Sequence, residues 1–175
     1  SHPEKLRSFF AAYLQKMSGV SLDENNIVMV CGAAAGLNVA LKALLNPGEE
    51  VIVLAPFFVE YGSYIEQAGG NTVIVNTVKD SFLIDGEAVE KAITSKTKAI
   101  IINSPNNPTG VVYSRKNLEQ LKAVLEKKEA ELGTHIFVIS DEPYVRLVYD
   151  GVEVPNILSV FPKSITINSF SKSLA

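Results

Sequence analysis

The chain has 175 residues, of which 47 % are hydrophobic and 20 % are charged, as in a single soluble globular domain. Its formal net charge of −3 is too small to indicate nucleic acid or a membrane surface as a partner, and no apolar run is long enough for a transmembrane helix. Cys31 is the only cysteine, which excludes an intrachain disulfide and fits a reducing compartment. The first residues do not resemble a secretory signal. We expect a cytoplasmic protein.

Apolar runs alternate with helical patterns from the start of the chain. Apolar side chains at helical spacing between positions 6 and 17 predict a helix, and residues 27–31 form the first short apolar run. A stripe at 37–45 predicts a second helix, which a Pro-Gly turn ends before the run at 51–55. The remaining predicted strands are further runs at 72–75, 99–102 and 136–139 and a weaker one at 164–168.

Consecutive apolar residues rich in Val and Ile are typical of strands buried on both faces, as in a parallel sheet covered by helices. Asp85 is a candidate N-cap for a short helix at 87–93. Ser114 and Gly133 are the candidate N-cap and C-terminal stop of a helix whose apolar stripe begins at Leu118. This alternation predicts an α/β fold, a three-layer sandwich with a mostly parallel sheet.

Ligands of open parallel sheets bind beyond the carboxyl ends of the strands, so the residues after each predicted strand are candidate site residues. The loop 32–36 (GAAAG) follows the first run and leads into a helix, where backbone N–H groups and the helix dipole favour an anion. Phe58 and Tyr61 follow the second run and offer aromatic faces to a planar ligand. Each feature also fits a structural reading, as a tight turn or as core aromatics.

Polar side chains follow the later strands. Residues 103–110 (NSPNNPTG) predict an ordered turn in which Asn107 can bond a ligand oxygen. Asp141 follows an apolar strand, and its carboxylate at the edge of a low-dielectric core needs a cationic or hydrogen-bonding partner. Lys172 follows the weak sixth run among small hydroxyl residues and is a candidate for a Schiff base. A turn, a cap and a solvated lysine are the structural alternatives, but all these features fall on one edge of one predicted sheet.

Three motifs, in this order and at these separations, resemble those of the class I and II aminotransferases, pyridoxal-phosphate (PLP) enzymes of fold type I. They are residues 107–110 (NPTG), 141–144 (DEPY) and 169–172 (SFSK). The resemblance implies that residues 1–175 are a partial PLP-binding large domain, with the N-terminal arm and the C-terminal small domain outside it. It also implies transfer of an amino group from an amino acid to a 2-oxo acid, in a homodimer.

The resemblance implies a role for each matching residue. Lys172 would form the internal aldimine with PLP and shuttle the α-proton, and Asp141 would keep the pyridine nitrogen protonated. Tyr144 and Asn107 would bond the ring's 3′ oxygen, so Lys172, Asp141 and Tyr144 are the expected catalytic residues. The remaining cofactor contacts are expected from Phe58 on the ring face and, at the phosphate, from Gly32, Ala33, Ala34 and Ser169.

The chain departs from the family pattern in two ways. Family members commonly have a polar side chain in the phosphate loop, where Ala33, Ala34 and Ala35 leave only backbone donors. The family also has an arginine on the phosphate shortly after the lysine, and an antiparallel strand that follows the lysine loop and inserts between earlier strands. Neither is expected within 1–175, so we expect a gap or an exposed edge in the sheet.

Alternatives to transamination remain open. The same core serves PLP-dependent lyases, decarboxylases and synthases, and a catalytically inactive fragment is a further alternative. A nucleotide-binding doubly wound domain is disfavoured, because the loop 32–36 lacks the expected glycine pattern. His2 and His135 have no metal-ligand spacing, so no metal site is expected, and Cys31 is expected to be a buried small residue.

Overall fold

The computed structural model describes residues 3–172, which form five strands and the helices that connect them. The strands are β1 (Glu50–Ala55), β2 (Asn71–Asn76), β3 (Thr97–Asn103), β4 (Phe137–Asp141) and β5 (Ile165–Ile167). The helices are α1 (Pro3–Ser18), the short 3₁₀ helix η1 (Glu24–Asn26), α2 (Gly32–Leu44), α3 (Glu60–Gln67), α4 (Gly86–Ala92), α5 (Arg115–Leu132) and α6 (Ile157–Val160).

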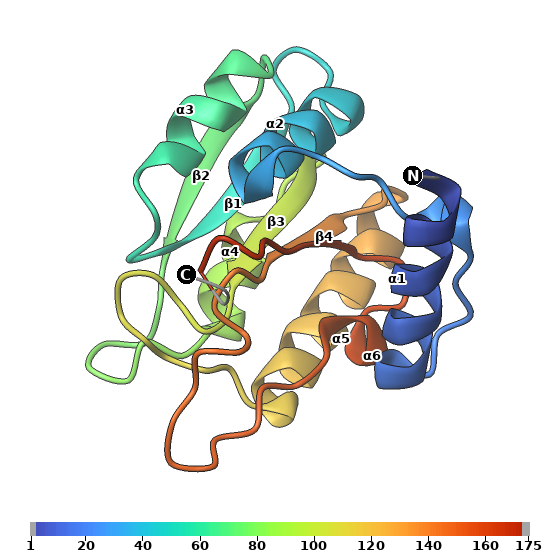
Figure 1. Ribbon diagram of the computed structural model, residues 1–175. Coiled ribbons are helices and arrows are strands. Elements are labelled where there is room, and N and C mark those ends of the chain that lie inside the picture. The colour runs from blue at the N-terminus through green and yellow to red at the C-terminus, as the bar shows by residue number, and fades with distance from the viewer. Residues whose placement is uncertain (1–2, 173–175) are drawn as a thin grey trace.

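All five strands belong to one sheet, in the order β2-β1-β3-β4-β5, and every neighbouring pair is parallel (Figure 1). The chain therefore starts the sheet at β1, adds β2 on one side and then builds β3, β4 and β5 on the other. Four of the five strands coincide with the consecutive apolar runs, and β5 with the weaker run. The predicted parallel sheet is confirmed.

Helices cover both faces of the sheet, because alternate side chains of the central strands β1, β3 and β4 enter two separate apolar clusters. One cluster joins α2 and α3 to the sheet, through residues that include Leu37, Leu41, Ile65, Val51 and Ile101. The other joins α4, α5 and α6 to the opposite face, through residues that include Val89, Leu118, Val160, Ile100 and Val138. This arrangement confirms the predicted three-layer sandwich.

The helix ends follow local sequence signals. The Asp85 side chain accepts a hydrogen bond from the backbone of Ala88 at 3.0 Å, and Ser114 accepts one from Asn117 at 3.2 Å. Both side chains satisfy an N–H group that has no partner inside its helix. Gly133 ends α5 with φ of 64°, a left-handed conformation that glycine adopts without strain. The predicted caps are thus confirmed.

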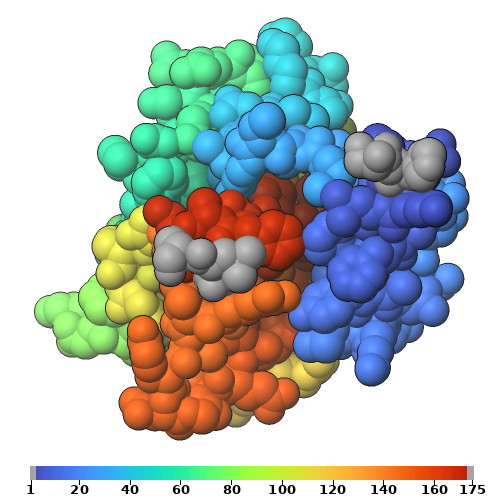
Figure 2. Space-filling view, in the orientation of Figure 1, coloured from blue at the N-terminus to red at the C-terminus, as the bar shows by residue number. Residues whose placement is uncertain are grey.

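The last described residues lie on the surface between elements from both ends of the chain. Figure 2 shows the segment around β5 (red) lying between the loop of residues 145–155 (orange) and α1 (blue). The ring of Phe170 packs against Phe10 of α1, with centroids 5.7 Å apart. On its outer edge β5 has no strand partner among residues 3–172. Within the same residues, no helix combines the length and apolar composition that crossing a bilayer requires.

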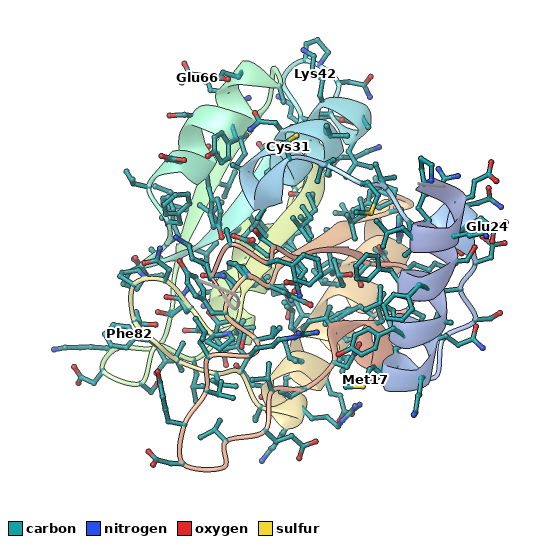
Figure 3. All side chains as sticks on the ribbon, viewed as in Figure 1. Met17, Glu24, Cys31, Lys42, Glu66 and Phe82 are labelled. Atoms are coloured by element: carbon teal, nitrogen blue, oxygen red, sulfur yellow. The ribbon has the colours of Figure 1, made fainter. Side chains whose placement is uncertain are left out.

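The predicted strand at 27–31 is wrong. Ile27 has extended dihedral angles, but the segment pairs with none of the strands in the described sheet. Extended backbone becomes a strand only when a neighbour supplies hydrogen bonds, and Val28 is 72 % exposed instead. Cys31, which precedes α2, is exposed rather than buried, because none of the elements formed by residues 3–172 covers it (Figure 3).

Two α-helices, α3 and α6, were not expected from the sequence. Helix α3 spans only two turns, contains Gly62, and buries just Tyr61 and Ile65, so its apolar residues show no clear helical period. Helix α6 is a single turn that Asn156 caps by accepting from the backbone of Leu158 at 3.0 Å. The omission of α3 matters, because this helix forms one wall of the candidate site.

Candidate active site

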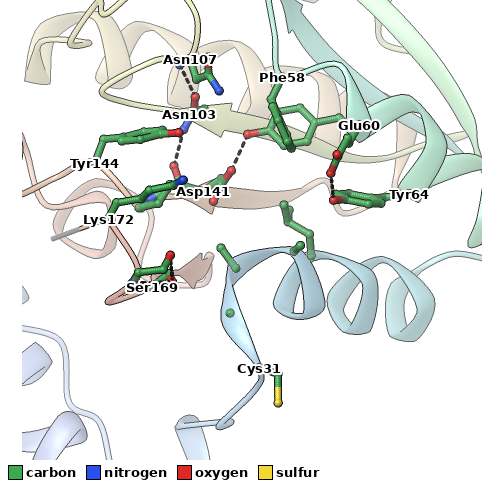
Figure 4. Close-up of a pocket in the computed structure, with 17 residues that line it drawn as sticks. Cys31, Phe58, Glu60, Tyr64, Asn103, Asn107, Asp141, Tyr144, Ser169 and Lys172 are labelled. Carbon is green, nitrogen blue, oxygen red and sulfur yellow. Dashed lines mark hydrogen bonds between the residues drawn. The ribbon is translucent and has the colours of Figure 1, made fainter. Parts of the chain in front are cut away.

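A cavity of about 410 Å³ opens at the carboxyl edge of the sheet, where the loops after β1, β3, β4 and β5 meet the start of α2 (Figure 4). The parallel strands bring these loops together, since all of them end at the same edge. Every residue predicted for the site lines this cavity: Gly32, Ala33, Ala34, Phe58, Asn107, Asp141, Tyr144, Ser169 and Lys172.

The N-terminus of α2 forms one wall of the cavity. Gly32 begins the helix with φ of 85°, which a residue with a Cβ atom rarely adopts, and Cys31 makes no side-chain cap. The first N–H groups of α2 are therefore left without a capping side chain, at the positive end of the helix dipole. A Cβ atom on Gly36 would stand 2.9 Å from Ile167, so this glycine allows α2 to lie against β5.

The turn after β1 is aromatic, and together with α3 it forms one wall of the cavity. The Phe58 ring meets Tyr61 edge to face, with centroids 5.6 Å apart, and Phe57 stacks on Tyr61 at 6.4 Å. Tyr61 is 2 % exposed, whereas Phe58 is partly buried and lines the cavity. Phe58 is therefore held by a packed neighbour, with part of its surface available to a ligand.

Asp141 ends β4 and is buried, with only 6 % of its surface exposed. Its Oδ2 accepts a hydrogen bond from the hydroxyl of Tyr61 at 2.6 Å, and its Oδ1 is buried without a hydrogen-bond partner among residues 3–172. Burial raises the pKa of Asp141, and the hydrogen bond from Tyr61 partly offsets that rise. Burial and the neighbouring carboxylate raise the pKa of Tyr61 far above its ordinary value, so Tyr61 keeps its proton and acts as the donor.

Asn103 connects β3, β4 and the turn that follows β3. Its Nδ2 donates to the backbone carbonyl of Asp141 at 2.8 Å, and its Oδ1 accepts from the backbone of Asn107 at 2.7 Å. Within the turn, Asn106 Oδ1 accepts from the backbone and the hydroxyl of Thr109 at 3.1 and 2.8 Å. These bonds confirm the predicted ordered turn and fix Asn107 at the rim of the cavity.

Lys172 extends from the loop after β5 into the cavity, toward Asp141 (Figure 4). The loop is held by short polar contacts: Ser169 Oγ lies 2.8 Å from Ser171 Oγ and accepts from the backbone of Ser171 at 3.2 Å. Tyr144 follows β4 on the adjacent side of the cavity. The structure therefore brings a lysine ammonium, a buried carboxylate and a phenol together around one space.

Several lining residues received no role from the sequence. Asn103 lies within residues 103–110 and Ser171 within residues 169–172, but nothing in their local sequence indicates what they contact. Glu60 and Tyr64 also line the cavity, and the Tyr64 hydroxyl donates to the Glu60 carboxylate, a bond that chiefly raises the pKa of Tyr64 to about 12. Their i, i+4 spacing would have been the signal, had α3 been recognised.

Metal-ligating side chains do not gather in the described part of the chain, where no three or more His, Cys, Asp or Glu residues could hold an ion. His135 pairs instead with Glu129, with 2.7 Å between Nδ1 and Oε1, just before β4 begins. His2 lies outside the described residues.

A family model described as "Aminotransferase class I and II" matches residues 1–175. The aspartate aminotransferase of Pyrococcus abyssi is 38 % identical, over 98 % of this chain and 44 % of that protein. Among solved structures, an aminotransferase from Eubacterium rectale has a TM-score of 0.93 at 38 % identity and is matched over 99 % of this chain and 44 % of its own. The aspartate aminotransferase of Thermotoga maritima has a TM-score of 0.88 at 39 % identity, over 99 % of this chain and 46 % of its own.

The chain thus spans less than half the length of the relatives that it matches. The match with the family model nevertheless extends over all 175 residues, and the same backbone path recurs in the solved relatives. It includes the sheet and the loops that form the cavity. The chain belongs to the class I and II aminotransferase family.

Proposed function

We propose that this chain is the cofactor-binding part of a PLP-dependent aminotransferase that passes an amino group from an amino acid to a 2-oxo acid. The observation that carries the proposal is the buried carboxylate of Asp141, which has one oxygen bonded to Tyr61 and the other without a partner among residues 3–172. A buried carboxylate oxygen without a donor is costly, and a protonated pyridine nitrogen is a donor of the required charge.

The rest of the cavity fits the same group. Uncapped N–H groups at the start of α2 suit the phosphate, and Ser169 offers a hydroxyl from the opposite loop. Phe58 presents part of its ring to the cavity, where it can stack on the pyridine. A volume of about 410 Å³ is in the range of small-molecule sites. The three alanines of the phosphate loop leave that contact to the backbone.

When bound, PLP supplies an electron sink that makes the bonds at the α-carbon of an amino acid labile. Lys172 Nζ would hold the cofactor covalently and, once released, would carry the α-proton. No other basic side chain lines the cavity among the described residues. Asp141 would keep the ring nitrogen protonated, and Asn107 and Tyr144 would bind the ring's 3′ oxygen from the neighbouring strand ends.

Transamination is favoured over the other PLP reactions by the names of the matched relatives, which include aspartate and aromatic-amino-acid aminotransferases. We extend the proposal to a homodimer in the cytoplasm, in which residues 1–175 form part of the large domain. The resemblance supports the homodimer, and the single free cysteine fits a reducing compartment.

The first test is covalent capture of the cofactor. The chain is mixed with PLP, reduced with borohydride, digested and analysed by mass spectrometry. We expect a pyridoxyl group on Lys172, absent in Lys172→Ala and retained in Lys79→Ala, which removes an exposed lysine that does not line the cavity. Adducts scattered over surface lysines, with none enriched at Lys172, would contradict the proposed site.

The second test separates the reactions that one cofactor site can support. Full-length protein loaded with PLP is mixed with L-aspartate or with an aromatic amino acid, and the products are followed by spectroscopy and chromatography. Conversion of the cofactor to its amine form with release of a 2-oxo acid, reversed by adding a 2-oxo acid, supports transamination. Release of ammonia or carbon dioxide points to a lyase or a decarboxylase, and no turnover points to an inactive protein.

A further inference from the structure

The shortest polar contact between two buried side chains around the cavity joins Tyr61 on α3 to Asp141 at the end of β4. The Tyr61 hydroxyl lies 2.6 Å from Asp141 Oδ2, and the two residues are 2 % and 6 % exposed. They are 80 positions apart in the chain, so the bond ties two different layers of the sandwich together. A contact this short, from a hydroxyl to a carboxylate, is among the stronger hydrogen bonds in proteins.

The direction of this bond is fixed by chemistry. Burial and the charge of Asp141 together hold the pKa of Tyr61 far above its ordinary value, so the phenol keeps its proton and donates to the ionised carboxylate. Oδ2 accepts this bond, and Oδ1 is the oxygen of Asp141 that has no hydrogen-bond partner among residues 3–172. Since Asp141 lines the cavity, a molecule bound there can supply a donor to its carboxylate.

Tyr61 is itself held in place on both sides. Its ring is stacked on Phe57 and edge-on to Phe58, and its backbone N–H donates to the carbonyl of Phe58 at 3.0 Å. A side chain fixed in this way loses little further freedom when it makes a hydrogen bond. The turn that places Phe58 against the cavity thus also places the Tyr61 hydroxyl against Asp141.

We infer that Tyr61 is a positioning residue, whose hydroxyl fixes the orientation of the Asp141 carboxylate so that Oδ1 faces the ring nitrogen of the cofactor. The inference rests on the proposed function and adds a residue to it. Tyr61 does not contact the reacting atoms in this role and acts through Asp141. The same bond favours the charged form of the buried carboxylate, because donation to a carboxylate stabilises the ion over the acid.

Other titratable groups surround the pair, and Tyr61→Phe must leave them unchanged. They are Glu60 and Tyr64 on α3, Glu142 and Tyr144 after β4, Tyr113 near α5, and Lys172 after β5. Tyr61→Phe removes one hydroxyl and alters none of them. Tyr113→Phe is the matched control, because Tyr113 is 1 % exposed and belongs to the core cluster on the other face of the sheet.

The experiment has one measurement without cofactor and one with PLP. Without cofactor, the pKa of Asp141 is followed by ¹³C NMR of its carboxyl carbon in the wild-type chain and both variants. We expect Tyr61→Phe to raise this pKa, since the lost bond stabilises the carboxylate, and Tyr113→Phe to leave it unchanged. With PLP, we expect Tyr61→Phe to bind about tenfold more weakly, as is typical for loss of a hydrogen bond to a charged group. The loss should grow as the pH falls through the raised pKa of Asp141.

The outcomes separate the two proposals. A wild-type chain that forms the Lys172 adduct, with PLP affinity and Asp141 pKa altered in Tyr61→Phe alone, supports the role of Tyr61. A wild-type adduct with equal PLP affinity in Tyr61→Phe and Tyr113→Phe overturns that role and leaves the proposed function standing. A wild-type chain without the adduct overturns the proposed function and, with it, the role of Tyr61.

Discussion

Asn103 connects two strands and a site loop, which makes Asn103→Ala a sensitive perturbation of both fold and site. The side chain is 3 % exposed and makes two hydrogen bonds to backbone groups, one to the carbonyl of Asp141 and one to the N–H of Asn107. Removing it leaves these groups without that partner, at about 1–3 kcal/mol each when buried. We therefore expect the free energy of unfolding to fall by about 3 kcal/mol, a large part of the usual 5–15 kcal/mol.

The assay is urea unfolding of the wild-type chain and the variant, followed by circular dichroism. With a slope of about 2 kcal/mol per molar urea, the unfolding midpoint should fall by roughly 1.5 M. Asn71→Ala is the matched control, because the exposed Asn71 side chain makes only a long 3.3 Å bond to the carbonyl of Gly48. That control should cost about 0.5 kcal/mol or less. Equal midpoints for the two variants would refute the reasoning that Asn103 holds the strand ends together.

Two further predictions concern pH and packing. Burial raises the pKa of Glu142 from 4.5 to about 7, so the folded chain retains a proton that the unfolded chain releases in this window, and stability falls as the pH rises through it. Glu142→Gln should remove up to about 3 kcal/mol of that loss between pH 5 and pH 8, and identical pH profiles of the unfolding midpoint would argue against it. Gly36→Ala should destabilise by about 1–3 kcal/mol, because the new methyl group meets Ile167 at 2.9 Å. Gly62→Ala in α3 should instead stabilise by about 0.5–1 kcal/mol, since its methyl group would reach only Thr72 at 3.9 Å, and melting temperatures that shift in the same direction would contradict this contrast.

Much of the fold could be predicted because its signals are local. The strands at 51–55, 72–75, 99–102 and 136–139 are consecutive apolar runs, which a sheet covered on both faces requires. The caps at Asp85 and Ser114 act on backbone groups three positions away, so short-range sequence is enough to identify them.

The wrong and missing predictions have two causes: a local pattern that needs a distant partner, and a helix too short to show a period. Residues 27–31 have the apolar composition of a strand, yet no neighbour among the described residues pairs with them. Helix α3 was missed because two buried residues in two turns give no clear period. Cys31 was expected to be buried because it ends the same wrongly predicted strand, and it is exposed.

The candidate site divides in the same way. The polar and aromatic side chains that follow each strand are visible in the sequence, and parallel pairing then requires them to meet at one edge of the sheet. How they are held depends on long-range contacts: the Tyr61–Asp141 bond spans 80 positions and the Asn103–Asp141 bond spans 38. Such bonds depend on how two layers or two strands settle against each other, and packing of the whole core sets that distance to within a few tenths of an ångström. Residue types and their order are therefore readable from the chain, whereas the orientation of a buried carboxylate is a property of the folded core.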